Sequence, residues 1–170
     1  MTDGTILALD LGTRTGWALR HADGRVESGV LNLKPKRHEG FGVRFYRLRR
    51  WLTATKNHAG GELCHLTYEY TPGQKARAAH IAGALEATVT AWCEHHDIPY
   101  RAANSATVKK HITGKGNADK AAVEAAVRAK GFDPETHDEA DALALLDLAL
   151  CRLDADYAAN SAPLFAQAAA

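Results

Sequence analysis

Three short extended segments open the chain, ahead of any helical periodicity. Residues 5–11 form an apolar run, and residues 17–20 and 25–33 follow it as further extended segments. Residues 22–24, Ala-Asp-Gly, stand between the second and third and are typical of a tight turn. Strands joined by so short a link pair as antiparallel neighbours. We therefore predict a sheet that begins with three antiparallel strands.

Helical and extended patterns alternate through the rest of the chain. Phe41, Phe45, Leu48 and Leu52 recur at the spacing of an amphipathic helix, which we expect to end near residues 60–61, a Gly-Gly pair. The further predicted elements are a strand at 65–70, a helix at 77–96, a strand at 98–102, and helices at 105–110, 118–130 and 139–153. This order predicts an α/β fold with a five-stranded mixed sheet flanked by helices.

Length and composition favour one domain. The chain has 170 residues, of which 46% are hydrophobic, and we expect residues 1–153 to form that domain and the Ala-rich residues 154–170 to form a tail. A signal peptide and a run of about 18 apolar residues are both missing from the sequence, so we expect a cytoplasmic protein without a membrane partner. The net charge is only +1, so any binding of nucleic acid must depend on local basic clusters.

Cysteine does not suggest a metal or disulfide framework. Cys64, Cys93 and Cys151 are odd in number, far apart, and each set among apolar residues. We expect reduced thiols in the core.

Two acidic residues lie in predicted strands. Asp10 closes the apolar run Ile-Leu-Ala-Leu, and a charge there, at the edge of a buried sheet, needs a partner. An Asp shortly before Gly12 and Thr13 is also typical of a turn. Glu69 alternates with Tyr68 and so points to the opposite face, where it could equally be an ordinary solvent-facing residue. Each residue alone leaves both interpretations open.

A pair of carboxylates at the start of the last predicted helix is more specific. Asp138 and Asp141 are three residues apart and can share one helix face. The helix macrodipole also favours acids there for purely structural reasons. Together with Asp10 and Glu69 they could form the oxygen-rich cage that Mg²⁺ or Mn²⁺ requires, since clustered Cys and His typical of zinc are missing from the sequence. Two such ions can hydrolyse a phosphodiester by activating water and stabilising the leaving oxygen.

Four segments in order resemble the RuvC family of Holliday-junction resolvases. They are LALDLGTRTG around Asp10, Tyr-Glu-Tyr around Glu69, residues 108–120, and Asp-Glu-Ala-Asp-Ala-Leu from Asp138, and the resemblance covers about residues 5–152. It implies a ribonuclease H-like fold, four catalytic metal ligands at Asp10, Glu69, Asp138 and Asp141, and two functional lysines at Lys109 and Lys120. It also implies a homodimer that resolves four-way DNA junctions by paired symmetric nicks.

Further residues could contact DNA near the predicted site. Any single lysine on a surface is more commonly just solvated, and Tyr70 is more commonly a core residue than a base-stacking one. His137 is a candidate for a supporting or proton-transfer role. The remaining candidates for DNA contact are Lys75, Arg77, Lys110, Lys115 and Tyr70.

Three other functions compete with branched-DNA cleavage. The Asp-Leu-Gly-Thr segment from Asp10 also resembles the phosphate loop of actin-like ATPases and sugar kinases, but those proteins need two such domains. The YqgF-like nucleases that process ribosomal RNA begin with a similar segment. A nucleic-acid-binding module without catalysis is the third possibility, and it would bind equally well without magnesium.

For the predicted homodimer, the candidate interface is the helix at 77–96. It carries small residues, Ala79 and Gly83 among them, that permit close helix approach, although its apolar stripe must also pack on its own sheet.

Overall fold

The computed structural model describes residues 4–70 and 76–153. Within these two stretches the elements, in chain order, are β1 (Ile6–Asp10), β2 (Arg14–Arg20), β3 (Val26–Asn32), α1 (Val43–His58), β4 (His65–Tyr70), α2 (Ala76–His95), β5 (Tyr100–Asn104), α3 (Ser105–Thr113), α4 (Lys120–Ala129) and α5 (His137–Leu153). No helix in them is long and apolar enough to span a membrane. The predicted tail at 154–170 lies outside the described residues, so the predicted domain boundary stays a prediction.

The sheet has the order β3-β2-β1-β4-β5. Its first three strands are antiparallel neighbours, whereas β1, β4 and β5 run parallel. The parallel pairs need crossovers, which α1 and α2 supply. The predicted five-stranded mixed sheet with an antiparallel start is therefore confirmed.

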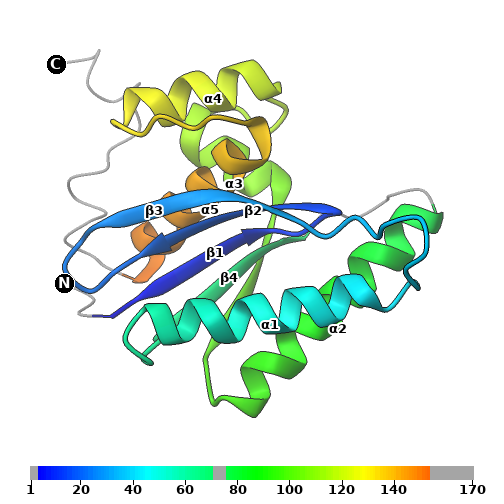
Figure 1. Ribbon diagram of the computed structural model, residues 1–170. Helices are drawn as coiled ribbons and strands as arrows, with labels where there is room; N and C mark the ends of the chain where they lie inside the picture. The colour runs from blue at the N-terminus through cyan, green and yellow to red at the C-terminus, as the bar shows by residue number, and fades with distance from the viewer. Residues whose placement is uncertain (1–3, 71–75, 154–170) are drawn as a thin grey trace, which may run out of the picture.

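The sheet separates two hydrophobic cores because alternate residues of each strand face opposite sides. On β1, Leu7 and Leu9 pack with α1 and α2, while Ile6 and Ala8 pack with α3, α4 and α5. Figure 1 shows α1 and α2 on one side of the sheet and the later helices on the other. Asp10 continues the alternation of Ile6 and Ala8, so it belongs to the face that α5 covers.

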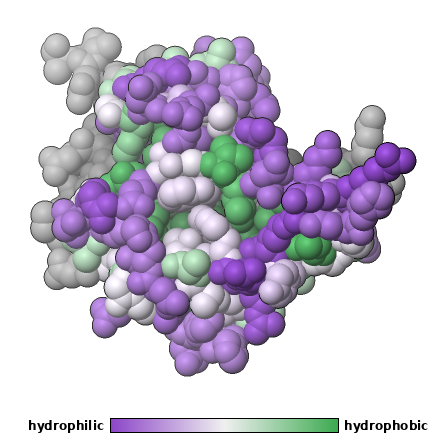
Figure 2. Space-filling view, in the orientation of Figure 1, coloured by the Kyte–Doolittle hydropathy of each residue, from purple (hydrophilic) through white to green (hydrophobic). Residues whose placement is uncertain are grey.

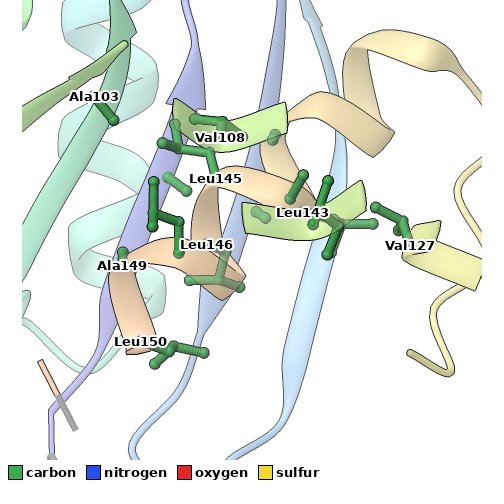
Figure 3. Packing of buried hydrophobic residues seen from close by; sticks show 14 of the residues in the cluster. Ala103, Val108, Val127, Leu143, Leu145, Leu146, Ala149 and Leu150 are labelled. Carbon is green, nitrogen blue, oxygen red and sulfur yellow. The ribbon is translucent and has the colours of Figure 1, made fainter. Parts of the chain in front are cut away.

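Helix α5 lies across β1 and β2 and is buried along most of its length. Leu143, Leu146 and Leu150 of α5 belong to one buried cluster with Val108 of α3 and Val127 of α4 (Figure 3). A helix that is apolar on nearly every side needs neighbours on every side. The sheet, α3 and α4 provide them.

One buried charge interrupts this apolar packing. Asp147 of α5 is only 2% exposed, and its carboxylate accepts hydrogen bonds from Nζ of Lys130 at 2.9 and 3.1 Å. Nε2 of His111 lies 2.7 Å from the same carboxylate. The three residues join α5 to α3 and to the end of α4, so the buried charge is both paired and hydrogen-bonded.

The surface over β3 differs from its surroundings. Figure 2 shows hydrophobic and near-neutral surface on the β3 side of the sheet, between hydrophilic surfaces over α4 and around α1. Strand β3 is an edge strand whose residues are half-buried except for Asn32. Leu31 and Val26 are each partly covered by a different core.

Several element boundaries differ from the sequence-based predictions. Strand β5 occupies 100–104 rather than 98–102, because Asp97 adopts a left-handed conformation (φ 54°) and the chain enters the sheet only afterwards. Helix α3 begins at Ser105 as predicted, capped by the side chain of Asn104, which accepts from the backbone N–H of Ala106, but it ends at Thr113 rather than at residue 110. Cys64 is exposed, so its predicted core position is wrong, whereas Cys93 is buried as expected.

Candidate metal centre and nucleic-acid surface

Asp10 and Glu69 occupy adjacent positions on neighbouring parallel strands. The register of β1 and β4 pairs Leu9 with Tyr68, and each acid is the next residue along its strand. Tyr68 packs in the core under α1 and α2, which places Glu69 on the face of α5 together with Asp10. Both acids thus stand at the carboxyl ends of parallel strands, where α/β proteins commonly bind ligands.

Asp138 and Asp141 approach the same sheet edge from the first turns of α5. Gly16 of β2, the pairing partner of Asp10, permits this approach. A Cβ atom at Gly16 would lie 1.8 Å from the carbonyl oxygen of Asp138, a separation that no side chain can occupy. Only glycine at this position lets the start of the helix meet the strand beside Asp10.

Thr136 and Glu139 fix where α5 begins. The hydroxyl of Thr136 accepts the backbone N–H of Glu139, as in the first half of a capping box. The Glu139 side chain accepts the N–H of Glu135 with one oxygen and the hydroxyl of Ser28, on β3, with the other. The helix therefore starts at His137 rather than at the predicted residue 139, and its first turn is tied to the sheet.

The charges of the four acids act on one another. Burial first, and then the charges of Glu69, Asp141 and Asp138, raise the pKa of Asp10 to about 8, whereas Lys120 acts to lower it. Burial also raises the pKa of Asp141, with Asp138 acting in the same sense. Crowded carboxylates with raised pKa values favour additional positive charge. A bound divalent cation would supply it, and carboxylate oxygens suit Mg²⁺ or Mn²⁺.

Arg14 is a member of the site that sequence reasoning missed. Its Nε donates to Oδ2 of Asp138 at 3.0 Å, from the first residue of β2. The Arg14 side chain is more than half exposed, so it contacts the acid and still reaches solvent. No local sequence pattern pointed to Arg14; in the structure the antiparallel pairing of Asp10 with Gly16 places the start of β2 beside the end of β1.

Lys109 and Lys120 lie close enough to the acids to influence them. Both lower the pKa of Asp141, against the effect of its burial. Lys120 is the first residue of α4, where Asp119 caps the helix by accepting the N–H of Ala122. The left-handed Gly114 ends α3 and turns the chain back, so both lysines border the acids.

The other predicted site residues are less directly placed. Lys110 and Lys115 are exposed, at the end of α3 and in the turn after it. Nδ1 of His137 lies 2.8 Å from a carboxylate oxygen of Glu124 and so links the start of α5 to α4. Lys75 and the side chains of Tyr70 and Arg77 lie outside the described residues. Their predicted roles stay predictions.

Comparison with solved structures identifies the fold. Thermus thermophilus RuvC superposes with a TM-score of 0.68 at 20% sequence identity, over 88% of this chain and 96% of that one. The T. thermophilus RuvC in complex with a Holliday junction substrate gives a TM-score of 0.70, also at 20% identity, over 84% of this chain and 90% of that one. This chain has the RuvC fold.

The similarity extends over most of both proteins, since each match covers at least 84% of either chain. The ribonuclease H-like architecture predicted from the sequence is therefore confirmed. No protein-family model matches the chain, and no curated protein matches it in sequence.

Proposed function

We propose that this protein is a metal-dependent endonuclease that cuts branched DNA, with four-way junctions as its principal substrate. The observation that carries the proposal is the convergence of Asp10, Glu69, Asp138 and Asp141 at one edge of a sheet with the RuvC fold. A solved RuvC of this fold holds a Holliday junction, which supports the same substrate class here.

The four acids are the proposed ligands of divalent metal, Mg²⁺ or Mn²⁺, with two ions in each site. When bound, the metal would polarise the phosphodiester and make water a stronger nucleophile. Gly16 and the capped start of α5 hold the acids of the helix against those of the strands. Asp10 must be deprotonated to serve as a ligand, and its pKa of about 8 means that metal competes with a proton there.

Lys109 and Lys120 are proposed to hold the DNA backbone beside the acids. Each carries a positive charge at the border of an otherwise negative cluster. This combination places a phosphate at the acids, because the lysines offset the repulsion between carboxylates and DNA. Lys110 and Lys115 extend the basic surface along the same turn.

A homodimer is the proposed working form, because two symmetric nicks need two sites related by a two-fold axis. The described part of α2 supports the predicted interface. Leu85, Val89 and Trp92 are buried against the protein's own core, while Gly83, Ala87 and Ala91 are exposed along the opposite side. Sedimentation at micromolar concentration, with and without a junction, tests this assembly, and a monomer that still cuts both strands symmetrically would contradict it.

The decisive experiment compares labelled four-way, three-way, flap and linear DNA and an RNA duplex, each with and without Mg²⁺. We expect metal-dependent cutting of the four-way junction, none by Asp10→Asn, and junction binding retained in that variant. Asp133→Asn, at an exposed acid, is the matched control and should cut normally. Preferential cutting of RNA would favour the YqgF-like function. Metal-independent binding without any cutting would favour a binding module.

A further inference from the structure

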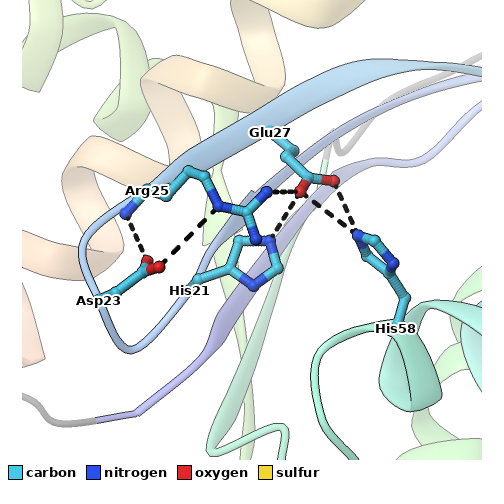
Figure 4. Close-up of polar contacts among 5 residues, drawn as sticks. All are labelled: His21, Asp23, Arg25, Glu27 and His58. Carbon is cyan, nitrogen blue, oxygen red and sulfur yellow. Dashed lines mark hydrogen bonds and ion pairs between the residues drawn. The ribbon is translucent and has the colours of Figure 1, made fainter.

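Glu27 of β3 lies between two histidines at the end of the sheet opposite the four acids. Its Oε1 is 3.0 Å from Nε2 of His21, and its Oε2 is 3.1 Å from Nε2 of His58 (Figure 4). The ligand atoms of the three residues lie within 4.8 Å of one another. His21 follows the end of β2, and His58 is the last residue of α1, so three elements meet at this point.

We propose that His21, Glu27 and His58 form a second metal site, selective for a transition ion of the Zn²⁺ class. A tetrahedral ion with bonds of about 2.0–2.1 Å holds its ligand atoms about 3.3 Å apart. The separations of 3.0 and 3.1 Å between Glu27 and the imidazoles are already close to that value. An ion can therefore enter the cluster with small outward shifts of the three side chains.

The ligand set separates this site from the four acids. Imidazole nitrogens bind zinc, nickel and copper well, whereas Mg²⁺ prefers oxygen ligands alone. Asp10, the last residue of β1, pairs with Gly16 of β2. Arg20, at the hairpin end of β2, pairs with Ile6 at the start of β1. The two ends of β1 are therefore roughly 13 Å apart, at a rise of about 3.3 Å for each residue. One ion cannot reach both clusters.

The cluster is held in shape before any ion binds. A tight turn fixes the His21 backbone, whose N–H donates to Arg25 at 2.8 Å and whose carbonyl accepts from Gly24 at 2.9 Å. The His21 side chain is 10% exposed, that of Glu27 29% and that of His58 59%. Two ligands are thus shielded, and His58 closes the site from the solvent side, where water can complete the coordination.

Arg25 competes with a cation for Glu27. Its guanidinium pairs with Oε1 of Glu27, and its Nε lies 3.9 Å from Asp23 (Figure 4). Partial burial acts to raise the pKa of Glu27, but the hydrogen bond and charge of His58 and the charge of Arg25 hold it below its usual range. Arg25 can keep Asp23 as its partner when an ion takes Glu27. Removal of Arg25 should therefore tighten metal binding.

The position of the site assigns it a structural role. It joins the β2–β3 hairpin to the end of α1, two parts of the fold that are far apart in sequence.

A hollow of about 230 Å³ beside Glu27 and His58 is also lined by Trp17 and Trp51, whose ring centroids are 5.6 Å apart. An ion that quenches fluorescence, such as Cu²⁺ or Ni²⁺, would report its arrival through these tryptophans.

Titration of the purified, metal-free protein with ZnCl₂, in a saturating excess of MgCl₂, tests the proposal. Calorimetry should show one zinc ion per chain, and zinc should raise the melting temperature. Glu27→Gln and His58→Ala should each weaken binding at least about tenfold, while Arg25→Ala should strengthen it. Ni²⁺ should quench tryptophan fluorescence in the wild type and much less in His58→Ala.

Two matched variants separate this site from other zinc binders. His38→Ala removes an exposed histidine elsewhere, and Asp10→Asn removes one of the four acids; both should bind zinc as the wild type does. His58 is exposed at a helix end, and Gln is nearly isosteric with Glu, so both test variants should fold, which circular dichroism checks. Failure of zinc to bind, or binding by Glu27→Gln and His58→Ala as tight as that of the wild type, would overturn the proposal.

Discussion

The backbone of Gly16 and the carbonyl oxygen of Asp138 approach so closely that a Cβ atom on the glycine would lie 1.8 Å from the oxygen. Substitution by alanine must push α5 away from β2 or distort the strand beside Asp10. We expect Gly16→Ala to destabilise the protein by about 1–3 kcal/mol, as overpacking does, and to reduce cleavage far more than binding. Denaturant unfolding and a junction-cutting assay measure the two effects.

Gly40→Ala is the control for that substitution, because nothing lies within 4 Å of a Cβ atom at Gly40. It should unfold and cut as the wild type does. Wild-type activity in Gly16→Ala would show that the approach of α5 to the strand does not position the acids.

The raised pKa of Asp10 predicts a pH-dependent stability in the absence of metal. The folded-state pKa of about 8 exceeds the ordinary value of 3.8, so between these values the folded protein holds a proton that the unfolded chain has released. The contribution of this group to stability is therefore present below about pH 4 and is lost as the pH rises towards 8. We expect the melting temperature in EDTA to fall over this range and Mg²⁺ to restore it most at the upper end.

Asp10→Asn should flatten this profile, because the amide does not titrate. It should also make the metal-free protein more stable than the wild type near pH 8, since the repulsion of Glu69, Asp141 and Asp138 is relieved. Parallel melting curves for the two proteins across pH 5 to 8 would contradict a raised pKa at Asp10.

Lys109→Ala and Lys120→Ala should each weaken junction binding and reduce the slope of log K against log salt by about one unit for each phosphate that the missing ammonium group neutralised. Fluorescence anisotropy at several salt concentrations gives the slope. Lys56→Ala, in the last turn of α1 at the other end of the sheet, should leave it unchanged. Equal slopes in all three variants would show that Lys109 and Lys120 are ordinary solvated surface residues and do not contact phosphate.

The pair of Asp147 with Lys130 predicts a large loss of stability on neutralisation of the acid. Asp147→Ala leaves the Lys130 ammonium, whose side chain is 17% exposed, without its carboxylate partner. We expect a cost of about 3–5 kcal/mol in the free energy of unfolding. Asp133→Asn, at a 96% exposed acid, should cost less than about 0.5 kcal/mol. Similar midpoints of urea unfolding for the two variants would contradict a large contribution of Asp147 to stability.

Periodicity in the sequence predicted the elements and their order because apolar spacing reports which face each element buries. The patterns correctly predicted the strands that carry Asp10 and Glu69, but they left open whether either acid belongs to a site. Interactions between distant elements left no such pattern. Arg14 reaches Asp138 across 124 residues, and the Glu27 cluster joins three elements, so neither appears as a local motif.

Boundaries were least predictable where a side chain decides them. The hydroxyl of Thr136 and the carboxylate of Glu139 start α5 two residues before its apolar pattern begins. The pattern Thr136-x-x-Glu139 is a capping-box signal that could have placed the helix start correctly.

The dependence of both the core and the four acids on α5 has a consequence for synthesis. This helix is the last element of the described fold, and it carries Asp138 and Asp141 as well as the leucines that cover β1 and β2. A chain still on the ribosome before residue 153 emerges has the strand acids but neither helix acid in place, and one face of its sheet lacks the helix that contacts β1 and β2. The nascent chain therefore depends on α5 both to leave the aggregation-prone state and to complete its acidic site.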